Sequence, residues 1–198
     1  PNAFIFENVR SFLKTPCTDN CEVMSINDMI DLRLSKDYLI HKKVMNFKNY
    51  GVNSSRTRTI VIGTHRRIKA LNPILMFPVA TKSNSLFETI GHLSPLDKMG
   101  EVDKYDVLHY FREYDKRMLP WIEATASNSS AFDNDLPELR PHSIIDGKMV
   151  PNKNLNADKY KRQDWQKVAP CVHTRNDILS SQNTVHPVDD RVFSIREL

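Results

Sequence analysis

Acidic and basic side chains stand beside two short apolar runs, where they could act on a bound ligand. One run begins at Phe4 and ends in Glu7-Asn8, and a second, β-branched run directly follows Arg56 and Arg58. A carboxyl group can hydrogen-bond or protonate a ligand, and a guanidinium can stabilise developing negative charge. Taken alone, a glutamate at a strand end or an Arg-x-Arg on a strand is about four times in five a solvated or structural charge. A functional assignment therefore needs further sequence context.

The first 70 residues predict the elements that position these side chains. Residues 3–6 are typical of a buried parallel strand, and open α/β sheets bind ligands beyond the carboxyl ends of such strands. Ser25 is the expected N-cap of a helix over 26–36, because an acid follows three residues later and apolar residues recur at helical spacing. Strands are expected over 39–47 and 59–63. These elements amount to half of an α/β domain.

From about residue 72 the composition shifts toward Pro, Asn, Ser and charge. The apolar spacing predicts helices over 86–93 and 103–119. Residues 125–160 hold few large apolar side chains and many turn formers, which predicts loops with short strands. A loop-rich segment of this length inside a compact chain is usually functional or mobile.

The composition narrows the class of protein. The 198 residues are 40% hydrophobic, which suits one globular core or a core with a looser lobe. No stretch approaches the roughly 20 apolar residues of a membrane span, and three cysteines form no disulfide framework, so we expect a cytoplasmic protein without a membrane partner. The net charge of +4 is compatible with a polyanionic partner but is only a weak indication. We expect no metal site, because Cys17 and Cys21 have the wrong spacing for zinc.

Three separated segments form an ordered set. They are residues 1–9, which hold Glu7-Asn8-Val9; residues 49–58, which hold Tyr50-Gly51 and Arg56-Thr57-Arg58; and residues 186–197, which end in Arg191-Val192-Phe193-Ser194-Ile195-Arg196-Glu197. The set resembles the Glu-Asn-Val, Tyr-Gly/Arg-x-Arg and Arg-x-Leu-[Ser/Thr]-x-Arg-Glu motifs of the DNA (cytosine-5)-methyltransferase family. The order and the variable insert between the second and third motifs make the match specific, and it spans nearly the whole chain.

The resemblance implies a reaction and residue roles. In the family, a cysteine thiolate adds to carbon 6 of cytosine, and carbon 5 then takes a methyl group from S-adenosylmethionine. Glu7 matches the carboxyl that reaches N3 and the exocyclic amine, and Arg58 matches the cation near O2. Arg56 would orient the pocket or a nearby phosphate. The residues expected to give structural support are Asn8, Arg191, Arg196 and Glu197.

Pro16-Cys17 matches the dipeptide that carries the family's nucleophile, but not its place in the chain. In the family the dipeptide precedes the Glu-Asn-Val strand, whereas here it follows Glu7 by nine residues. We therefore predict that Cys17 is not the nucleophile and that this chain holds none. The Gly-rich turn that holds S-adenosylmethionine also lies upstream in the family, so most of the cofactor pocket is expected outside this chain.

The fold expected from the resemblance is α/β, a partial Rossmann-like methyltransferase sheet plus a small irregular target-recognition lobe. Residues 1–71 would belong to the catalytic domain, 72–185 to the recognition region and 186–198 to a segment returning to the catalytic domain. Double-stranded DNA is the expected partner. Side chains suited to base edges are Thr174, Arg175, Asn176 and Gln182, and those suited to phosphates are Lys161 and Arg162.

Two departures and two alternatives accompany this interpretation. Asn53-Ser54 stand where the family has Pro-Gln, and Cys171 stands where it has Thr. The intact protein is expected to flip cytosine from duplex DNA and methylate it, as the modification half of a bacterial restriction system. The alternatives are a non-catalytic, sequence-specific DNA-binding module and one subunit of a split methyltransferase. Both chain ends look cut, which favours a truncated enzyme, and we expect the chain alone to be inactive.

Overall fold

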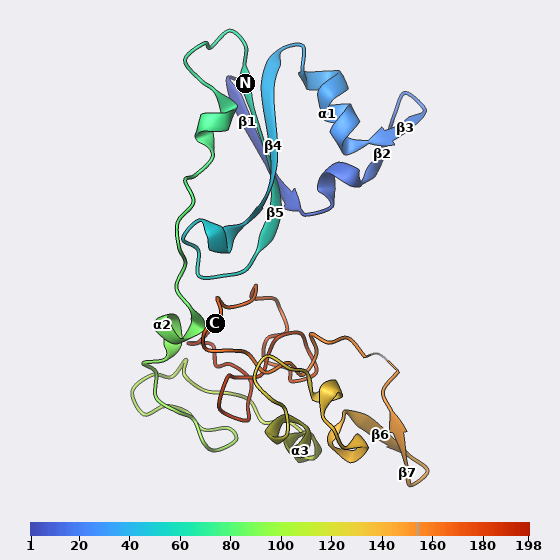
Figure 1. Cartoon of the computed structure of the whole chain (residues 1–198), viewed down its shortest axis with the longest axis vertical. Coiled ribbons are helices and arrows are strands. Elements are labelled where there is room, and N and C mark those ends of the chain that lie inside the picture. Colours follow the sequence, from blue (N-terminus) through green and yellow to red (C-terminus); the bar gives the residue numbers. More distant parts are fainter. Residues whose placement is uncertain (154) are drawn as a thin grey trace. The chain divides into compact units, whose positions relative to one another are not determined.

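The structure is a computed structural model that describes residues 1–153 and 155–198. The chain forms two compact units, unit 1 (Pro1–Ser83) and unit 2 (Asn84–Leu198), which are shown in Figure 1 and described separately. The structural boundary falls after residue 83. The functional boundaries expected after residues 71 and 185 stay predictions.

Unit 1 is built on a three-stranded antiparallel sheet with the order β1-β5-β4 (Figure 1). The central strand is β5 (Thr57–His65), which lies between β1 (Ala3–Val9) and β4 (Tyr38–Asn46). The expected strands over 39–47 and 59–63 are confirmed. The strand at 3–6 is also confirmed, but its expected burial and parallel pairing are wrong. β1 is an edge strand of this sheet that pairs antiparallel with β5, which leaves Ile5 60% exposed.

Helix α1 (Ile26–Leu34) follows a hairpin formed by β2 (Pro16–Asp19) and β3 (Glu22–Ser25). The Oγ of Ser25 accepts the backbone N–H of Asp28 at 3.1 Å, which confirms the expected N-cap. Lys42 ties α1 to β4, because its Nζ donates to the side chain of Asn27 at 2.8 Å. The 3-10 turns of this unit are η1 (Phe12–Lys14), η2 (Phe47–Asn49) and η3 (Pro73–Met76).

Unit 2 consists mostly of loops that short elements hold in place. Helix α2 (Leu86–Ile90) begins with a capping box, and α3 (Leu119–Glu123) follows the turn η4 (Lys116–Met118). β6 (His142–Ile145) and β7 (Lys148–Pro151) form a hairpin, and the further 3-10 turns are η5 (Ala131–Asp133) and η6 (Pro137–Leu139). The loops with short strands expected over 125–160 are confirmed for the described residues. The helix expected over 86–93 is present but ends at Ile90.

The core of unit 2 joins segments that are far apart in the sequence. Its main apolar cluster consists of Leu96, Phe111, Trp121, Ile122, Ala131, Tyr160, Leu179, Val185 and Val192. A second cluster holds Leu86, Ile90 and Phe193, with Trp165 packed against it. Burial of these side chains is what fixes the loops between them.

The prediction of a helix over 103–119 is wrong. The Oδ1 of Asp103 accepts the backbone N–H groups of Tyr105 and Asp106, and the Oδ1 of Asp106 accepts that of Leu108. These side-chain bonds satisfy N–H groups that a helix would pair with backbone carbonyls, so the aspartates favour turns. Helical structure in this region is limited to η4 and the start of α3.

Candidate functional site

Glu7 and Arg58 meet on one face of the β1–β5 strand pair. Arg58 lies opposite Val9 in the register, and Glu7 is two residues from Val9, so strand alternation puts both charged side chains on the same face. The Nε of Arg58 lies 3.0 Å from Oε1 of Glu7, and its Nη1 donates to the Thr57 carbonyl at 2.8 Å. The structure therefore brings together two residues that are 51 positions apart in the sequence (58 − 7).

The two side chains of this ion pair differ in exposure. The side chain of Arg58 is 19% exposed and that of Glu7 is 50% exposed. Among the described residues, Oε2 of Glu7 has no hydrogen-bond partner. Such an exposed ion pair typically contributes only about 0–1 kcal/mol to stability. The arrangement suits a carboxylate that is oriented on one side and open to a ligand on the other.

Asn8 and Arg56 hold the backbone beside the Glu7–Arg58 pair. Alternation puts Asn8 on the opposite face of β1 from Glu7, and its Oδ1 accepts the Val9 N–H at 2.9 Å. The half-buried Arg56 precedes β5, and its carbonyl accepts the Phe47 N–H at 2.9 Å. This backbone contact fixes the start of the strand that carries Arg58. The roles expected for Asn8 and Arg56 stay predictions.

Cys17 lies in β2, where its Sγ donates to the Met24 carbonyl across the hairpin at 3.6 Å. Its thiol is free and half-buried, like that of Cys171. Within the part of the chain that the structure describes, no group of three or more His, Cys, Asp or Glu side chains could hold a metal ion.

Arg162 is a buried structural cation, which contradicts the expected phosphate contact. It is 5% exposed. Its Nε and Nη2 donate to the carbonyls of Thr125 and Ile122, both at 2.8 Å, and Nη2 also pairs with Asp190. Its Nη1 lies 3.1–3.2 Å from the carbonyls of His186, Val188 and Asp189. The guanidinium is thus fully engaged inside unit 2.

Lys161 and Gln182 lie on neighbouring segments of unit 2. An isolated bridge pairs Lys159 with Gln182, and the Val185 N–H donates to the Lys161 carbonyl at 3.2 Å. Gln182 is exposed, and the Nζ of Lys161 lies 3.9 Å from the Asp158 carboxylate at a half-buried position. The structure therefore brings together two residues that were expected to contact DNA. Their roles stay predictions.

The loop 173–177 divides its side chains between the surface and the interior. Thr174 and Arg175 are exposed, as side chains that contact DNA must be. Asn176 is 6% exposed, and its Oδ1 accepts the His173 N–H at 2.6 Å. This burial does not fit the direct reading of a base edge in a groove that was expected for Asn176.

The segment 186–197 forms a buried network of ion pairs. Arg191 is 2% exposed, and its Nη1 and Nη2 donate to the two carboxylate oxygens of Glu197 at 2.7 and 2.8 Å. Burial raises the pKa of Glu197, but hydrogen bonds from Arg191 and attraction to its charge more than offset this, so the pKa lies below its usual value. Burial and the nearby Arg191 guanidinium lower the pKa of His186 to about 4. Arg196 differs from Arg191, because it pairs with Asp106 at the surface.

Two histidines contribute to this segment in ways that the sequence analysis missed. The ring of the buried His109 bonds Ser194 Oγ at 2.8 Å and the Ser94 carbonyl at 2.7 Å. His186 accepts the Asp189 N–H on Nδ1 at 3.0 Å. The Arg-x-Leu-like motif marked this segment, but nothing in the sequence indicated its partner 85 residues upstream.

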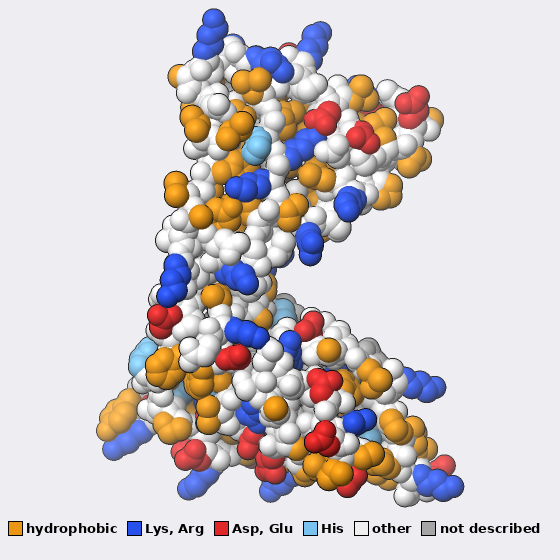
Figure 2. Space-filling model, in the orientation of Figure 1, with side chains coloured by type: hydrophobic (Ala, Val, Ile, Leu, Met, Phe, Trp, Pro, Cys, Tyr) orange, Lys and Arg blue, Asp and Glu red, His pale blue; other side chains and the backbone are white. Residues whose placement is uncertain are grey.

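Charge alone does not mark a binding surface. On the face shown in Figure 2, Lys and Arg side chains are spread over both units, and in unit 2 they interleave with Asp and Glu. Among the described residues, no helix is both long and apolar enough to cross a membrane.

Comparison with known proteins shows the family. The model of C-5 cytosine-specific DNA methylases matches residues 1–198. The type II methyltransferase M1.HgaI of Avibacterium volantium is 27% identical over 209 residues, which cover 100% of this chain and 54% of that protein. M.HgiCII of Herpetosiphon aurantiacus, also a type II methyltransferase, is 28% identical over 94 residues, which cover 47% of this chain and 20% of that protein. The chain therefore belongs to the C-5 cytosine-specific DNA methylase family, and it spans about half the length of M1.HgaI.

A solved structure supports the α/β fold. The chain aligns over its full length with 57% of a DNA modification methyltransferase encoded within a prophage of E. coli, at a TM-score of 0.59 and 14% identity. At this identity the likeness shows the fold alone.

Proposed function

We propose that this chain is part of a DNA cytosine-5 methyltransferase that extrudes a cytosine from duplex DNA and methylates carbon 5. The Glu7–Arg58 ion pair is the observation that carries the proposal, because two residues from separate motifs of the family meet at 3.0 Å. The type II names of both relatives support a role in a restriction-modification system. The likeness to a solved methyltransferase supports a Rossmann-like sheet in the intact protein, with β1, β5 and β4 as part of it. The cytoplasmic location stays a prediction.

In this proposal Glu7 and Arg58 bind opposite ends of one polar edge of the extruded cytosine. The open Oε2 of Glu7 would meet N3 and the exocyclic amine, where a hydrogen bond or a shared proton offsets negative charge that builds on the ring. Arg58 would approach O2, and its bond to Glu7 would keep the carboxylate oriented before the base arrives. A nucleophilic thiolate would come from outside residues 1–198.

The residues of this chain do not fit the main binding turn for S-adenosylmethionine, which would supply the methyl group. A cofactor of this kind needs a Gly-rich turn between a strand and a helix. Here Gly63 lies inside β5, where an added Cβ would come within 2.2 Å of the Phe4 ring, and Gly51, Gly100 and Gly147 have positive φ in loop turns. These four glycines therefore serve packing and turns.

Methyl transfer tests this proposal. Full-length protein and the 198-residue chain would be incubated with duplex DNA and S-adenosylmethionine labelled in its methyl group, and 5-methylcytosine would be measured. We expect transfer by the full-length protein and none by the chain alone. Glu7→Gln in the full-length protein should bind DNA but lose rate by about a hundredfold or more, because the carboxyl acts mainly in the transition state.

Controls separate catalysis from folding. Asp19→Asn removes the half-buried ion-pair partner of the exposed Arg33, and it should leave the rate unchanged. Near-normal turnover of Glu7→Gln would show that the carboxyl is structural. Methyl transfer by the 198-residue chain would show that the parts of the active site have been assigned wrongly.

A further inference from the structure

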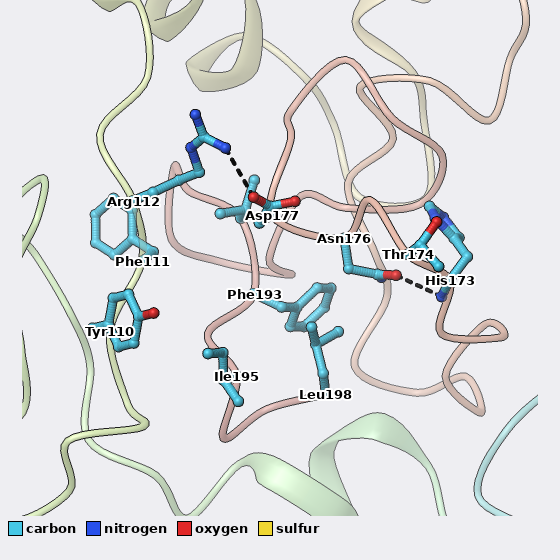
Figure 3. Close-up of a pocket in the computed structure, with 11 residues that line it drawn as sticks. Tyr110, Phe111, Arg112, His173, Thr174, Asn176, Asp177, Phe193, Ile195 and Leu198 are labelled. Carbon is cyan, nitrogen blue, oxygen red and sulfur yellow. Dashed lines mark hydrogen bonds and ion pairs between the residues drawn. The ribbon is translucent and has the colours of Figure 1, made fainter.

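A cavity of about 370 Å³ opens in unit 2 beside the loop 173–177 (Figure 3). Its apolar wall is formed by Tyr110, Phe193, Ile195 and Leu198. The volume lies within the roughly 300–1,000 Å³ that is typical of sites for small molecules and cofactors. The cavity therefore has room for one planar ring system and a wall suited to its faces.

Asn176 supplies a polar group to this cavity. Its side chain lies beside Phe193 and Leu198 in Figure 3, and it is more than nine-tenths buried. Its Oδ1 is occupied by the His173 N–H, whereas Nδ2 has no hydrogen-bond partner among the described residues. No buried side-chain polar atom of the described chain is sealed from solvent without a partner, so Nδ2 retains solvent contact, and Asn176 is among the residues that line the cavity. A buried amide donor without a partner indicates a ligand that presents an acceptor.

The surroundings of Asn176 indicate which ligand that is. The Nε2 of His173 lies 2.8 Å from the Gln182 carbonyl and donates to it, because a carbonyl only accepts. Arg175 is exposed and, among the described residues, has no carboxylate partner, so it can meet a phosphate. Aromatic and aliphatic walls, an amide donor and a nearby cation together match one nucleotide of a DNA strand.

We propose that this cavity binds one unstacked nucleobase of the DNA partner, in addition to the cytosine proposed for Glu7 and Arg58. The inference rests on the proposed function in taking DNA as the partner. The base lies against Tyr110 and Phe193, and Asn176 donates from Nδ2 to a ring nitrogen or carbonyl oxygen of the base. Extruding a base costs least at a mismatch, where stacking and pairing are already weak.

A thermodynamic cycle tests the cavity. The probes are a duplex with one mismatched nucleotide and the same duplex with an abasic analogue at that position. Their dissociation constants with the full-length protein are measured by fluorescence anisotropy at one salt concentration. We expect the base to tighten binding by about tenfold, the size of one stacking contact with one hydrogen bond. In Asn176→Asp the ratio should fall about three- to fivefold, because the aspartate retains the acceptor for His173 and loses the donor, whereas the stacking contact remains.

Asn134→Asp is the matched control. Asn134 is another buried amide of unit 2, and its Nδ2 donates to the carbonyls of Trp121 and Leu139 at 2.8 and 2.6 Å. This variant should lower the unfolding temperature and leave the binding ratio unchanged. Tyr110→Ala, at a partly exposed position of the wall, should lower the ratio even if Asn176→Asp folds poorly.

Three results would overturn the proposal: a wild-type ratio near one, an unchanged ratio in well-folded Asn176→Asp, or a ratio lost only in Glu7→Gln, which would place the base at that carboxylate. None of these depends on methyl transfer. A failure of the cavity proposal is thereby distinguished from a failure of the proposed function, which appears as absent 5-methylcytosine.

Discussion

Truncation of Arg162 should destabilise unit 2 severely. Arg162→Ala removes the donors that serve the buried carbonyls of Ile122 and Thr125, and it leaves the Asp190 carboxylate without its cation. Each buried acceptor left unsatisfied costs about 1–3 kcal/mol, whereas the ion pair with Asp190, whose side chain is 41% exposed, adds only about 0–1 kcal/mol. Since these losses overlap, we expect a decrease of about 4 kcal/mol in the free energy of unfolding. This is a large part of the roughly 5–15 kcal/mol that holds a typical protein folded.

Urea unfolding of the full-length protein, with salt titration of DNA affinity alongside, measures this effect. Lys161→Ala is the matched control, because it removes the neighbouring cation, whose partner lies 3.9 Å away. It should change stability by less than about 1 kcal/mol. Our reasoning would be refuted if Arg162→Ala kept wild-type stability while weakening all DNA sequences alike and reducing the slope of log affinity against log salt by about one. That pattern is expected of a phosphate contact.

Two further predictions concern unit 2. The pKa of His186 is about 4 in the folded protein and about 6.5 in the unfolded chain. Between these pH values the unfolded chain binds more protons than the folded protein. The free energy of unfolding should therefore drop by up to about 3 kcal/mol as the pH falls from about 6.5 to about 4. His186→Asn, which can retain the acceptor for the Asp189 N–H, should remove most of this pH dependence in urea unfolding curves, and an unchanged curve would contradict the assignment. Arg175→Ala should cost about 1–3 kcal/mol at one base pair and relax specificity there, whereas Lys161→Ala should weaken cognate and scrambled duplexes alike. The reverse result in the salt titration would place the base-reading surface at residues 159–161.

Local sequence signals predicted the elements of unit 1 because their causes are local. The Ser25 cap and the β-branched run of β5 act within a few residues, and both elements form where the sequence indicates. Strand direction is different, because it depends on which distant segment pairs with β1. A short apolar run carries no signal for this choice, so the antiparallel pairing with β5 could not be predicted from it.

The prediction of a helix over 103–119 was wrong because, here too, distant contacts determine the structure. The apolar spacing around Phe111 is helical, but Asp103 and Asp106 compete for backbone N–H groups, and Phe111 is buried in a core assembled from residues 96–192. Propensity is a weak prior when tertiary burial favours another conformation. The aspartates were a signal that could have been used.

In the candidate site, too, sequence motifs identified some residues, whereas the burial of others depends on distant contacts. The order of three motifs selected Glu7 and Arg58 as candidates, and in the structure their side chains form an ion pair. The run Lys159-Tyr160-Lys161-Arg162, in contrast, looks like a solvated basic stretch. Arg162 differs from its neighbours because backbone carbonyls of Ile122, Thr125 and residues 186–189 accept hydrogen bonds from its guanidinium. These acceptors are distant in the sequence, so no local pattern indicates them.

Alternation along this run explains why neighbouring cations have different roles. Tyr160 and Arg162 are buried, whereas Lys159 and Lys161 are only half-buried, so burial alternates along the run. The run is not a regular strand, because Tyr160 has a positive φ of 49°. Backbone bonds hold the run on two sides, since Ala131 N–H donates to the Tyr160 carbonyl and Val185 N–H donates to that of Lys161. The buried cation thus fixes the backbone that presents Lys161, and replacing it should impair DNA binding through loss of structure.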